Sequence, residues 1–221
     1  MKICYLISED YLKLTLNSIS YIKKFSTTSD SLEFIIFHFG DLEGVEVPGV
    51  IKKKIPKLNY PFFLHRGLMF DEFDEKVIFM DSDTICMTNI SKLYNIDLDG
   101  NLLGVAQHNW LVTHKEAFKV YRPTELLKEN ITSDDFPFFN AGVMLVDCSL
   151  WKNIGATNIV LDFFEKYRGE WYDWNDEVAL NCLFGRDRCK FIDNRWNYNE
   201  TSFGKPFIKH YYGHTKNLLQ L

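Results

Sequence analysis

The stretch that decides the fold reads KVIFMDSDT and spans residues 76–84. Its first five residues form a short apolar run that is typical of a buried strand. Asp81 and Asp83 follow directly, and residues i and i+2 of an extended chain point the same way. Two carboxylates this close repel each other unless a positive charge lies between them. A hard divalent cation with oxygen ligands would provide that charge and would also hold a diphosphate. A strand-end turn with two solvated acids explains the same residues.

Strands and helices alternate along the rest of the chain. This alternation predicts an α/β fold with a mostly parallel sheet, in which ligands bind beyond the carboxyl ends of the strands. The 221 residues contain no repeat or low-complexity linker, which favours a single domain. Besides the strand at 76–80, the pattern predicts strands at residues 2–7, 32–39, 50–55, 102–106, 143–146, 190–192 and 207–212, and helices at residues 11–25, 61–73, 158–167 and 176–184.

Composition argues against several classes of protein. The net charge is -5 and no long basic run occurs, so nucleic-acid binding is not expected. The five cysteines form no CxxC pair, which argues against a disulfide framework or a structural zinc site and for a reducing compartment. The N-terminal apolar stretch is too short for a signal peptide, and no window is long enough to span a bilayer. We therefore expect a soluble cytoplasmic protein without an integral membrane segment.

Three further polar motifs lie beside predicted strands or helices, namely FNAGVML at 139–145, NDEVALN at 175–181 and HYYGHTK at 210–216. The amide of Asn140 can bind a sugar hydroxyl, although for this motif alone an Asx turn at a strand start is the better explanation. Asn175 or Asp176 can cap the helix that follows, where the helix dipole favours acids. His210 can ligate a metal, and Lys216 can neutralise a phosphate. A C-terminal turn with incidental polar residues is the alternative for the last motif.

Taken together and in this order, the four motifs resemble the retaining glycosyltransferases of family 8, the group that includes glycogenin and bacterial lipopolysaccharide galactosyltransferases. Residues 8–11, Arg66 and residues 195–198 add weaker matches, so the resemblance covers nearly the whole chain. It implies a GT-A fold with a Rossmann-like, mostly parallel central sheet flanked by helices. It also implies one catalytic domain over residues 1–221, with a nucleotide-binding half at 1–105 and a half for the sugar and acceptor at 106–221.

The resemblance also implies roles for individual residues. Asp81, Asp83 and His210 would hold the metal, with Asp81 also contacting the ribose beside Ser82. The diphosphate would lie against Gly213 and Lys216. The residues expected to surround the uracil, with Tyr11 stacking on the ring, are Ser8, Asp10 and Tyr11. The residues expected at the donor sugar are Arg66, Asn140, Asp176 and Glu177, with Glu177 nearest the anomeric carbon.

The implied activity is transfer of a hexose from a UDP-sugar, with UDP-glucose or UDP-galactose favoured, to a carbohydrate or glycoconjugate acceptor with retention of configuration. A mixed Asp and His site favours Mn²⁺, with Mg²⁺ as the other candidate. Two routes fit the residues. The acceptor can attack from the leaving-group face, or Glu177 can act as a covalent nucleophile, with Asp176 and Asn140 beside it.

The chain departs from the family pattern at several positions. Glu177 replaces a glutamine, His108 stands near the place of an acid, and Asn217-Leu218 replaces Pro-Trp. The sequence ends just past Lys216, so it is either a minimal enzyme or one domain of a longer protein. Two other functions fit parts of the same pattern. A haloacid-dehalogenase-like phosphohydrolase also has DxD after a strand, but it needs Thr or Val where Ile85 stands. A catalytically silent UDP-sugar-binding module would retain the same binding residues.

Overall fold

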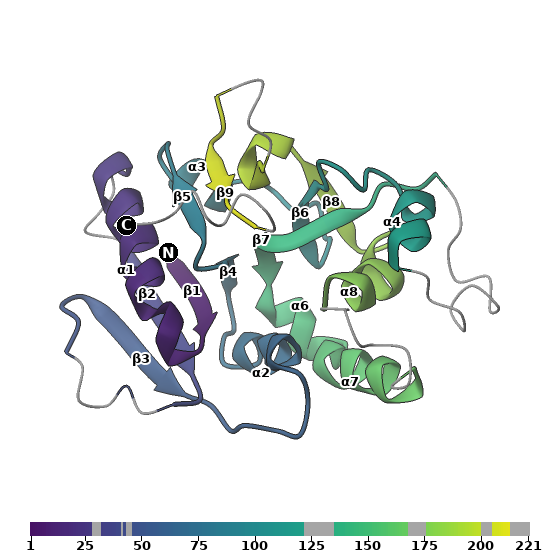
Figure 1. The fold of residues 1–221 in the computed structure, drawn as a ribbon, viewed down its shortest axis with the longest axis horizontal. Coiled ribbons are helices and arrows are strands. Elements are labelled where there is room, and N and C mark those ends of the chain that lie inside the picture. The colour runs from purple at the N-terminus through teal and green to yellow at the C-terminus, as the bar shows by residue number, and fades with distance from the viewer. Residues whose placement is uncertain are drawn as a thin grey trace.

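In the computed structural model, the described residues are 1–27, 32–40, 42, 46–121, 135–167, 176–199 and 205–212. They form a seven-stranded sheet covered by helices on both faces (Figure 1). The strand order is β3-β2-β1-β4-β7-β6-β8. The bounds are β1 Lys2–Ile7, β2 Glu33–His38, β3 Val50–Lys54, β4 Lys76–Met80, β6 Leu103–Gln107, β7 Phe139–Asp147 and β8 Cys189–Ile192.

Most neighbouring strands of this sheet are parallel, which confirms the predicted fold class. β1 pairs in parallel with β2 and β4, β2 with β3, and β6 with β8. Of the strands described in this sheet, β7 alone runs antiparallel to its neighbours β4 and β6. A second, small antiparallel sheet joins β5 (Thr84–Cys86) to β9 (Ile208–His210).

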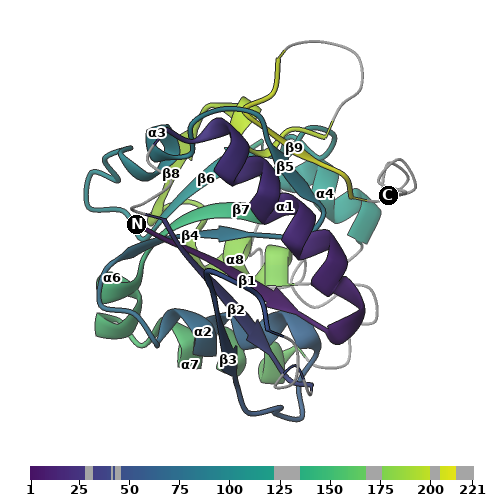
Figure 2. The same ribbon diagram turned by 90° about the vertical axis from the view of Figure 1, so that its left-hand side faces the viewer.

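Helices and the small sheet cover the two faces separately (Figure 2). One face carries α1 (Leu12–Phe25), α3 (Ser91–Tyr94) and the small sheet, with Ile3, Tyr5 and Ile7 of β1 in their apolar cluster. The other face carries α2 (Arg66–Phe70), α6 (Cys148–Asn153), α7 (Ala156–Lys166) and α8 (Asp176–Phe184), with Cys4 and Leu6 in the second cluster. The alternation along β1 follows from the two-residue period of a strand. Short 3₁₀ turns lie at Glu9–Tyr11, Phe62–His65 and Asn194–Asn197, and α4 spans His114–Tyr121.

The observed elements differ from the predicted ones mainly around short segments. The helix predicted at residues 61–73 is a 3₁₀ turn followed by α2, and the strand predicted at 143–146 begins at Phe139. Asn140 therefore lies inside β7 and not in a turn before it. The sequence patterns did not indicate β5, α3, α4 and α6. These elements are too short to show a clear period, and β5 owes its conformation to pairing with β9.

Candidate active site

The loop after β4 is fixed by bonds to both neighbouring layers. The backbone N–H of Asp81 donates to the carbonyl of Gly142 on β7 at 2.7 Å. The Ser82 hydroxyl accepts from Thr15 of α1 at 2.9 Å. The Thr84 hydroxyl donates to the carbonyl of Asp81 at 2.6 Å. These bonds hold the two aspartates at the carboxyl end of β4, where the sequence predicted a ligand site.

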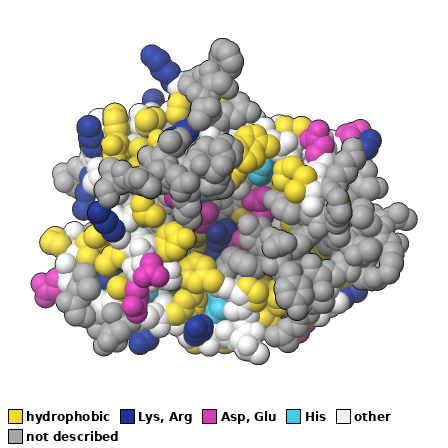
Figure 3. Space-filling model, in the orientation of Figure 1, with side chains coloured by type: hydrophobic (Ala, Val, Ile, Leu, Met, Phe, Trp, Pro, Cys, Tyr) yellow, Lys and Arg dark blue, Asp and Glu magenta, His cyan; other side chains and the backbone are white. Residues whose placement is uncertain are grey.

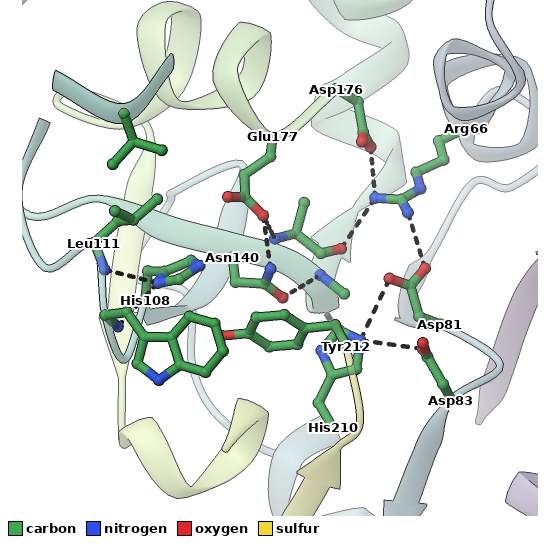
Figure 4. Close-up of a pocket in the computed structure, with 14 residues that line it drawn as sticks. Arg66, Asp81, Asp83, His108, Leu111, Asn140, Asp176, Glu177, His210 and Tyr212 are labelled. Carbon is green, nitrogen blue, oxygen red and sulfur yellow. Dashed lines mark hydrogen bonds and ion pairs between the residues drawn. The ribbon is translucent and has the colours of Figure 1, made fainter. Parts of the chain in front are cut away.

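His210 reaches these aspartates through the small sheet, in which it lies directly opposite Thr84. Its Nε2 is 3.1 Å from Oδ1 of Asp83 and 3.7 Å from Oδ2 of Asp81 (Figure 4). One ligand atom from each of the three side chains lies within 4.8 Å of the other two. The structure thus brings together the three residues that the sequence predicted as metal ligands.

The hydrogen bonds of Asn197 determine which nitrogen of His210 carries the proton. The amide nitrogen of Asn197 donates to the backbone carbonyl of Asn140 at 3.0 Å and to its side-chain oxygen at 2.8 Å. The amide oxygen of Asn197 therefore faces Nδ1 of His210, at 2.8 Å. Because this oxygen only accepts, Nδ1 is the donor and Nε2 directs its lone pair toward two carboxylates. This donor set fits a divalent cation. Asn197 lies in the weakly matching segment 195–198, but its role in orienting His210 was not predicted.

Gly142 is another residue whose part in the site the sequence did not indicate. A Cβ atom at this position would lie 2.0 Å from Cε1 of His210 and 2.9 Å from Oδ2 of Asp81. Any larger residue on this part of β7 would push the imidazole away from the carboxylates. The small residue in the FNAGVML motif is therefore explained by close packing against His210.

We expect Gly142→Ala to displace the His210 ring and so to abolish any rise in melting temperature on addition of Mn²⁺ and UDP. The control is Gly104→Ala, whose methyl group would lie 2.8 Å from Leu98 in the core, at the far end of a flexible side chain. It should lower the melting temperature but keep the response to Mn²⁺. Differential scanning fluorimetry measures both. An unchanged Mn²⁺ response in Gly142→Ala would show that the ring does not need this approach.

Arg66 connects the aspartate loop with α8. Its guanidinium lies 2.8 Å from Oδ1 of Asp81 and 2.5 Å from Oδ2 of Asp176, and it donates to the carbonyl of Ala141 at 3.1 Å. Burial raises the pKa of Asp176 to about 6, although the Arg66 charge acts in the opposite direction. The guanidinium thus holds the predicted sugar-binding residues against the end of β4.

Glu177 lies beside this ion pair and is bound to the start of β7. Its Oε2 accepts from the side-chain amide of Asn140 at 2.7 Å and from the N–H of Ala141 at 3.3 Å (Figure 4). Burial raises the pKa of Glu177 to about 8, and Asp176 adds to the effect. Asn181, one turn further along α8, binds the N–H and carbonyl of Phe139 at 2.9 Å each. These two hydrogen bonds to the backbone of Phe139 fix α8 against β7.

A central cavity of about 570 Å³ gathers most of the predicted residues. In the space-filling view, charged side chains lie in a hollow bordered by hydrophobic ones (Figure 3). The predicted residues that line the central cavity are Arg66, Asp81, Asp83, His108, Asn140, Asp176, Glu177 and His210.

An adjacent cavity of about 430 Å³ shares Asp81 and Asp83 with the central one. It is also lined by Ser8, Tyr11 and Ser82, as predicted, and by Phe62, which the sequence did not single out. Asp10 is not among these residues. It lines an outer cavity of about 480 Å³ that shares Ser8 and Phe62 with the adjacent one. Gly213 and Lys216, the predicted diphosphate ligands, lie outside the described residues.

The chain is similar to known glycosyltransferases in sequence and in fold. A putative glycosyltransferase of Haemophilus influenzae is 28% identical over 145 residues, which cover 66% of this chain but only 38% of that relative. The crystal structure of the galactosyltransferase LgtC with donor and acceptor sugar analogues superposes with a TM-score of 0.72 at 18% identity, over 97% of this chain and 88% of that one. A structure of an active-site mutant of LgtC, with glutamate in place of glutamine, gives a TM-score of 0.70 at 19% identity, over 96% and 88%. These likenesses confirm the GT-A fold.

No helix within the described residues is both long and apolar enough to cross a bilayer.

The model of the family described as Glycosyl transferase family 8 matches residues 52–217. That range contains the aspartates after β4, the start of β7, the start of α8 and His210. The chain therefore belongs to glycosyl transferase family 8.

Proposed function

We propose that the chain is a metal-dependent glycosyltransferase that moves a hexose, glucose or galactose, from a UDP-sugar to a carbohydrate or glycoconjugate acceptor with retention of configuration. The observation that carries this proposal is that the central cavity and the adjacent cavity meet at the carboxyl end of β4. Asp81 and Asp83 line both the central cavity, with its sugar-binding side chains, and the adjacent cavity, with Tyr11. A nucleotide in the adjacent cavity would place its diphosphate at the aspartates and its sugar in the central cavity.

The metal ligands in this proposal are Asp81, Asp83 and His210, and the mixed oxygen and nitrogen set favours Mn²⁺ over Mg²⁺. A cation held there would act as a Lewis acid on the diphosphate and as a template for its orientation. The family resemblance adds Gly213 and Lys216 as further diphosphate ligands.

The chain's own side chains orient the donor sugar in this proposal. Arg66 and Asp176 form a buried ion pair, so both are already fixed when a sugar hydroxyl arrives. The same holds for the Asn140 amide, which Glu177 and Asn197 fix from two sides. Within the described residues, the hydrogen bonds of Glu177 to β7 are made by Oε2, and Oε1 is the atom that we assign to the anomeric carbon. The covalent route and attack from the leaving-group face both remain compatible with it.

We expect Tyr11→Ala to weaken UDP binding by ~1–3 kcal/mol, the usual contribution of a ring that stacks on a nucleobase. Tyr11 is 37% exposed and Phe62 is 41% exposed, and both line the adjacent cavity. Tyr11→Phe should bind UDP nearly as tightly as the wild type, because the stacking surface is kept. Calorimetric titration with UDP in Mn²⁺ measures the difference. Equal affinity of the wild type and Tyr11→Ala would place the uracil elsewhere.

A panel of UDP-, GDP- and dTDP-sugars tests the function itself, with free nucleotide measured in the presence and absence of Mn²⁺. We expect release from UDP-glucose or UDP-galactose that requires Mn²⁺. Binding of UDP without release or transfer would favour a catalytically silent module. Release of phosphate from simple phosphomonoesters would favour a haloacid-dehalogenase-like phosphohydrolase, which the fold and the family do not support.

A further inference from the structure

One part of the lining of the central cavity is mainly aromatic. The described residues of this part, the aromatic wall, are His108, Trp110, Leu111, Val120 and Tyr212, and none of them is Lys, Arg, Asp or Glu. Arg66, Asp81, Asp83 and Asp176 lie on the other side of the cavity (Figure 4). A cavity with one charged and one aromatic wall has room for two ligand groups of different chemistry.

Trp110 and Tyr212 form the core of this wall, and we call them the aromatic platform. Their ring centroids are 5.6 Å apart with the planes at 53°. Tyr212 also packs against the metal-ligand candidate His210, with ring centroids 4.6 Å apart. The platform therefore begins next to the proposed cation site and extends away from it along the same cavity.

His108 holds Trp110 in place. Its ring Nδ1 accepts hydrogen bonds from the backbone N–H groups of Trp110 at 3.0 Å and of Leu111 at 2.9 Å, and the backbone N–H of His108 donates to the carbonyl of Phe138 at 2.7 Å. Burial, together with the nearby His210, lowers the pKa of His108 to about 4, so the ring is neutral and accepts these bonds at physiological pH. The turn that carries Trp110 is thus fixed before any ligand arrives.

Trp110 is 43% exposed, although it lines the central cavity, which also contains Arg66 and the carboxylates. A large aromatic side chain that only filled the core would bury nearly all its surface. An exposed aromatic surface held rigidly at the edge of a polar site is typical of a ligand contact. The nucleotide and the donor sugar already have other places in the proposed function, at the adjacent cavity and at the charged wall.

We propose that the aromatic platform binds the acceptor, and that the acceptor is an uncharged pyranoside whose ring stacks on Trp110. This inference rests on the proposed transferase function. One face of a pyranose presents C–H groups, which pack against the electron-rich face of an aromatic ring. The absence of charged groups from the described residues of this wall disfavours uronic acids and phosphorylated sugars, because nothing there would neutralise them.

The test compares Trp110→Ala, Trp110→Phe and the wild type with neutral methyl pyranosides and disaccharides, glucuronic acid, and the acyclic polyol sorbitol as acceptors. The measured quantity is the ratio of sugar transfer to donor hydrolysis at low acceptor concentration. The assay uses the donor sugar and the cation that give nucleotide release in the panel of UDP-, GDP- and dTDP-sugars. Phe25→Ala is the matched control, because Phe25 is an aromatic residue of similar exposure, 38%, at the end of α1 and lines none of the three cavities. Quenching of tryptophan fluorescence by each pyranoside gives a second readout that needs no turnover.

We expect neutral pyranosides to be the best acceptors, and Trp110→Ala to lower the transfer ratio about tenfold or more, as for the loss of an aromatic anchor. Trp110→Phe should recover part of it, and Phe25→Ala should match the wild type. The proposal is wrong if Trp110→Ala keeps the wild-type ratio, if glucuronic acid or sorbitol is used as well as pyranosides, or if no pyranoside binds or accepts. Failure of the transferase proposal is seen separately, as absence of nucleotide release by the wild type. In that case quenching by pyranosides that disappears in Trp110→Phe would still support the platform.

Discussion

Asp83→Ala should reduce sugar transfer by about a thousandfold or more, since a cation that neutralises a departing diphosphate contributes several kcal/mol to the transition state. The same change should abolish the dependence of UDP affinity on Mn²⁺. Asp83 lies at a strand end, where its Oδ1 is 3.1 Å from Nε2 of His210 and faces the proposed cation site, so the apolar core does not depend on its side chain. We therefore expect a folded protein with nearly normal far-ultraviolet circular dichroism.

Calorimetric titration of UDP with and without Mn²⁺ measures the binding part of this prediction, and nucleotide release measures the rest. Asp162→Ala is the control, because it removes the same charge from an exposed position on α7. It should leave both quantities unchanged. If Asp83→Ala still binds UDP more tightly in Mn²⁺ than in its absence, the assignment of the cation to this group is wrong.

Glu177→Gln should lower turnover about ten- to a hundredfold while it changes the affinity for UDP-sugar little, because an amide cannot ionise and so cannot place a full negative charge at the anomeric carbon in the transition state. Glutamine has the same shape, and its oxygen can still accept from Asn140 and Ala141 as Oε2 does. The donor pocket should therefore keep its geometry. Steady-state kinetics of nucleotide release give the turnover, and wild-type turnover in this variant would exclude a catalytic role. A glycosyl adduct on Glu177, detected by mass spectrometry, would select the covalent route.

The same substitution has an expected effect on stability that depends on pH. Burial raises the pKa of Glu177 to about 8, so the folded state keeps a proton that the unfolded chain releases above about pH 5. The free energy of unfolding of the wild type should then fall as pH rises from about 5 to about 8, by at most ~1.4 kcal/mol per pH unit for this group. Asp176, with a pKa of about 6, contributes a fall of the same sign at the lower end. Glu177→Gln should remove the fall between pH 6 and pH 8.

Urea unfolding at pH 6, 7 and 8, without added cation, measures this slope. Glu165→Gln removes the same kind of charge from an exposed position on α7 and should keep the wild-type slope. An equal slope in the wild type and in Glu177→Gln would mean that Glu177 is ionised in the folded protein at neutral pH.

The elements that the sequence predicts well are those whose conformation follows from local pattern. The apolar runs of β1 and β4 and the first turn of α8 were predicted at their observed bounds. The position of Asp81 and Asp83 follows from the same pattern, since a strand-end carboxylate needs no distant partner to be placed. Arg66, Asn140, Asp176 and Glu177 were predicted through the family resemblance, and they line one cavity.

The remaining features depend on contacts between residues that are far apart in the sequence. The pairing of β5 with β9 brings His210 to Asp83. The strand predicted at residues 207–212 contains β9, but β5 has no periodic signal of its own, so the pairing could not be predicted. The amide of Asn197 binds both Asn140 and His210, a relation that only the folded chain reveals. The sequence did not indicate a binding role for Trp110, because an isolated tryptophan is usually part of a core. Only its exposed fraction in the folded chain distinguishes it from a core residue.

The antiparallel direction of β7 has a consequence for how this enzyme family can diversify. Asn140, Ala141 and Gly142 lie at the start of an internal strand with hydrogen-bonded neighbours on both sides. An insertion there would shift the register by one residue and turn every side chain to the other face. In the proposed function these residues lie at the donor sugar, so donor choice would change through single replacements there and not through a change of length. Residues 108–113, between β6 and α4, lie outside the sheet, where changes of length are tolerated. If the aromatic platform binds the acceptor as proposed, acceptor choice is free to diverge by insertion while the donor side stays fixed.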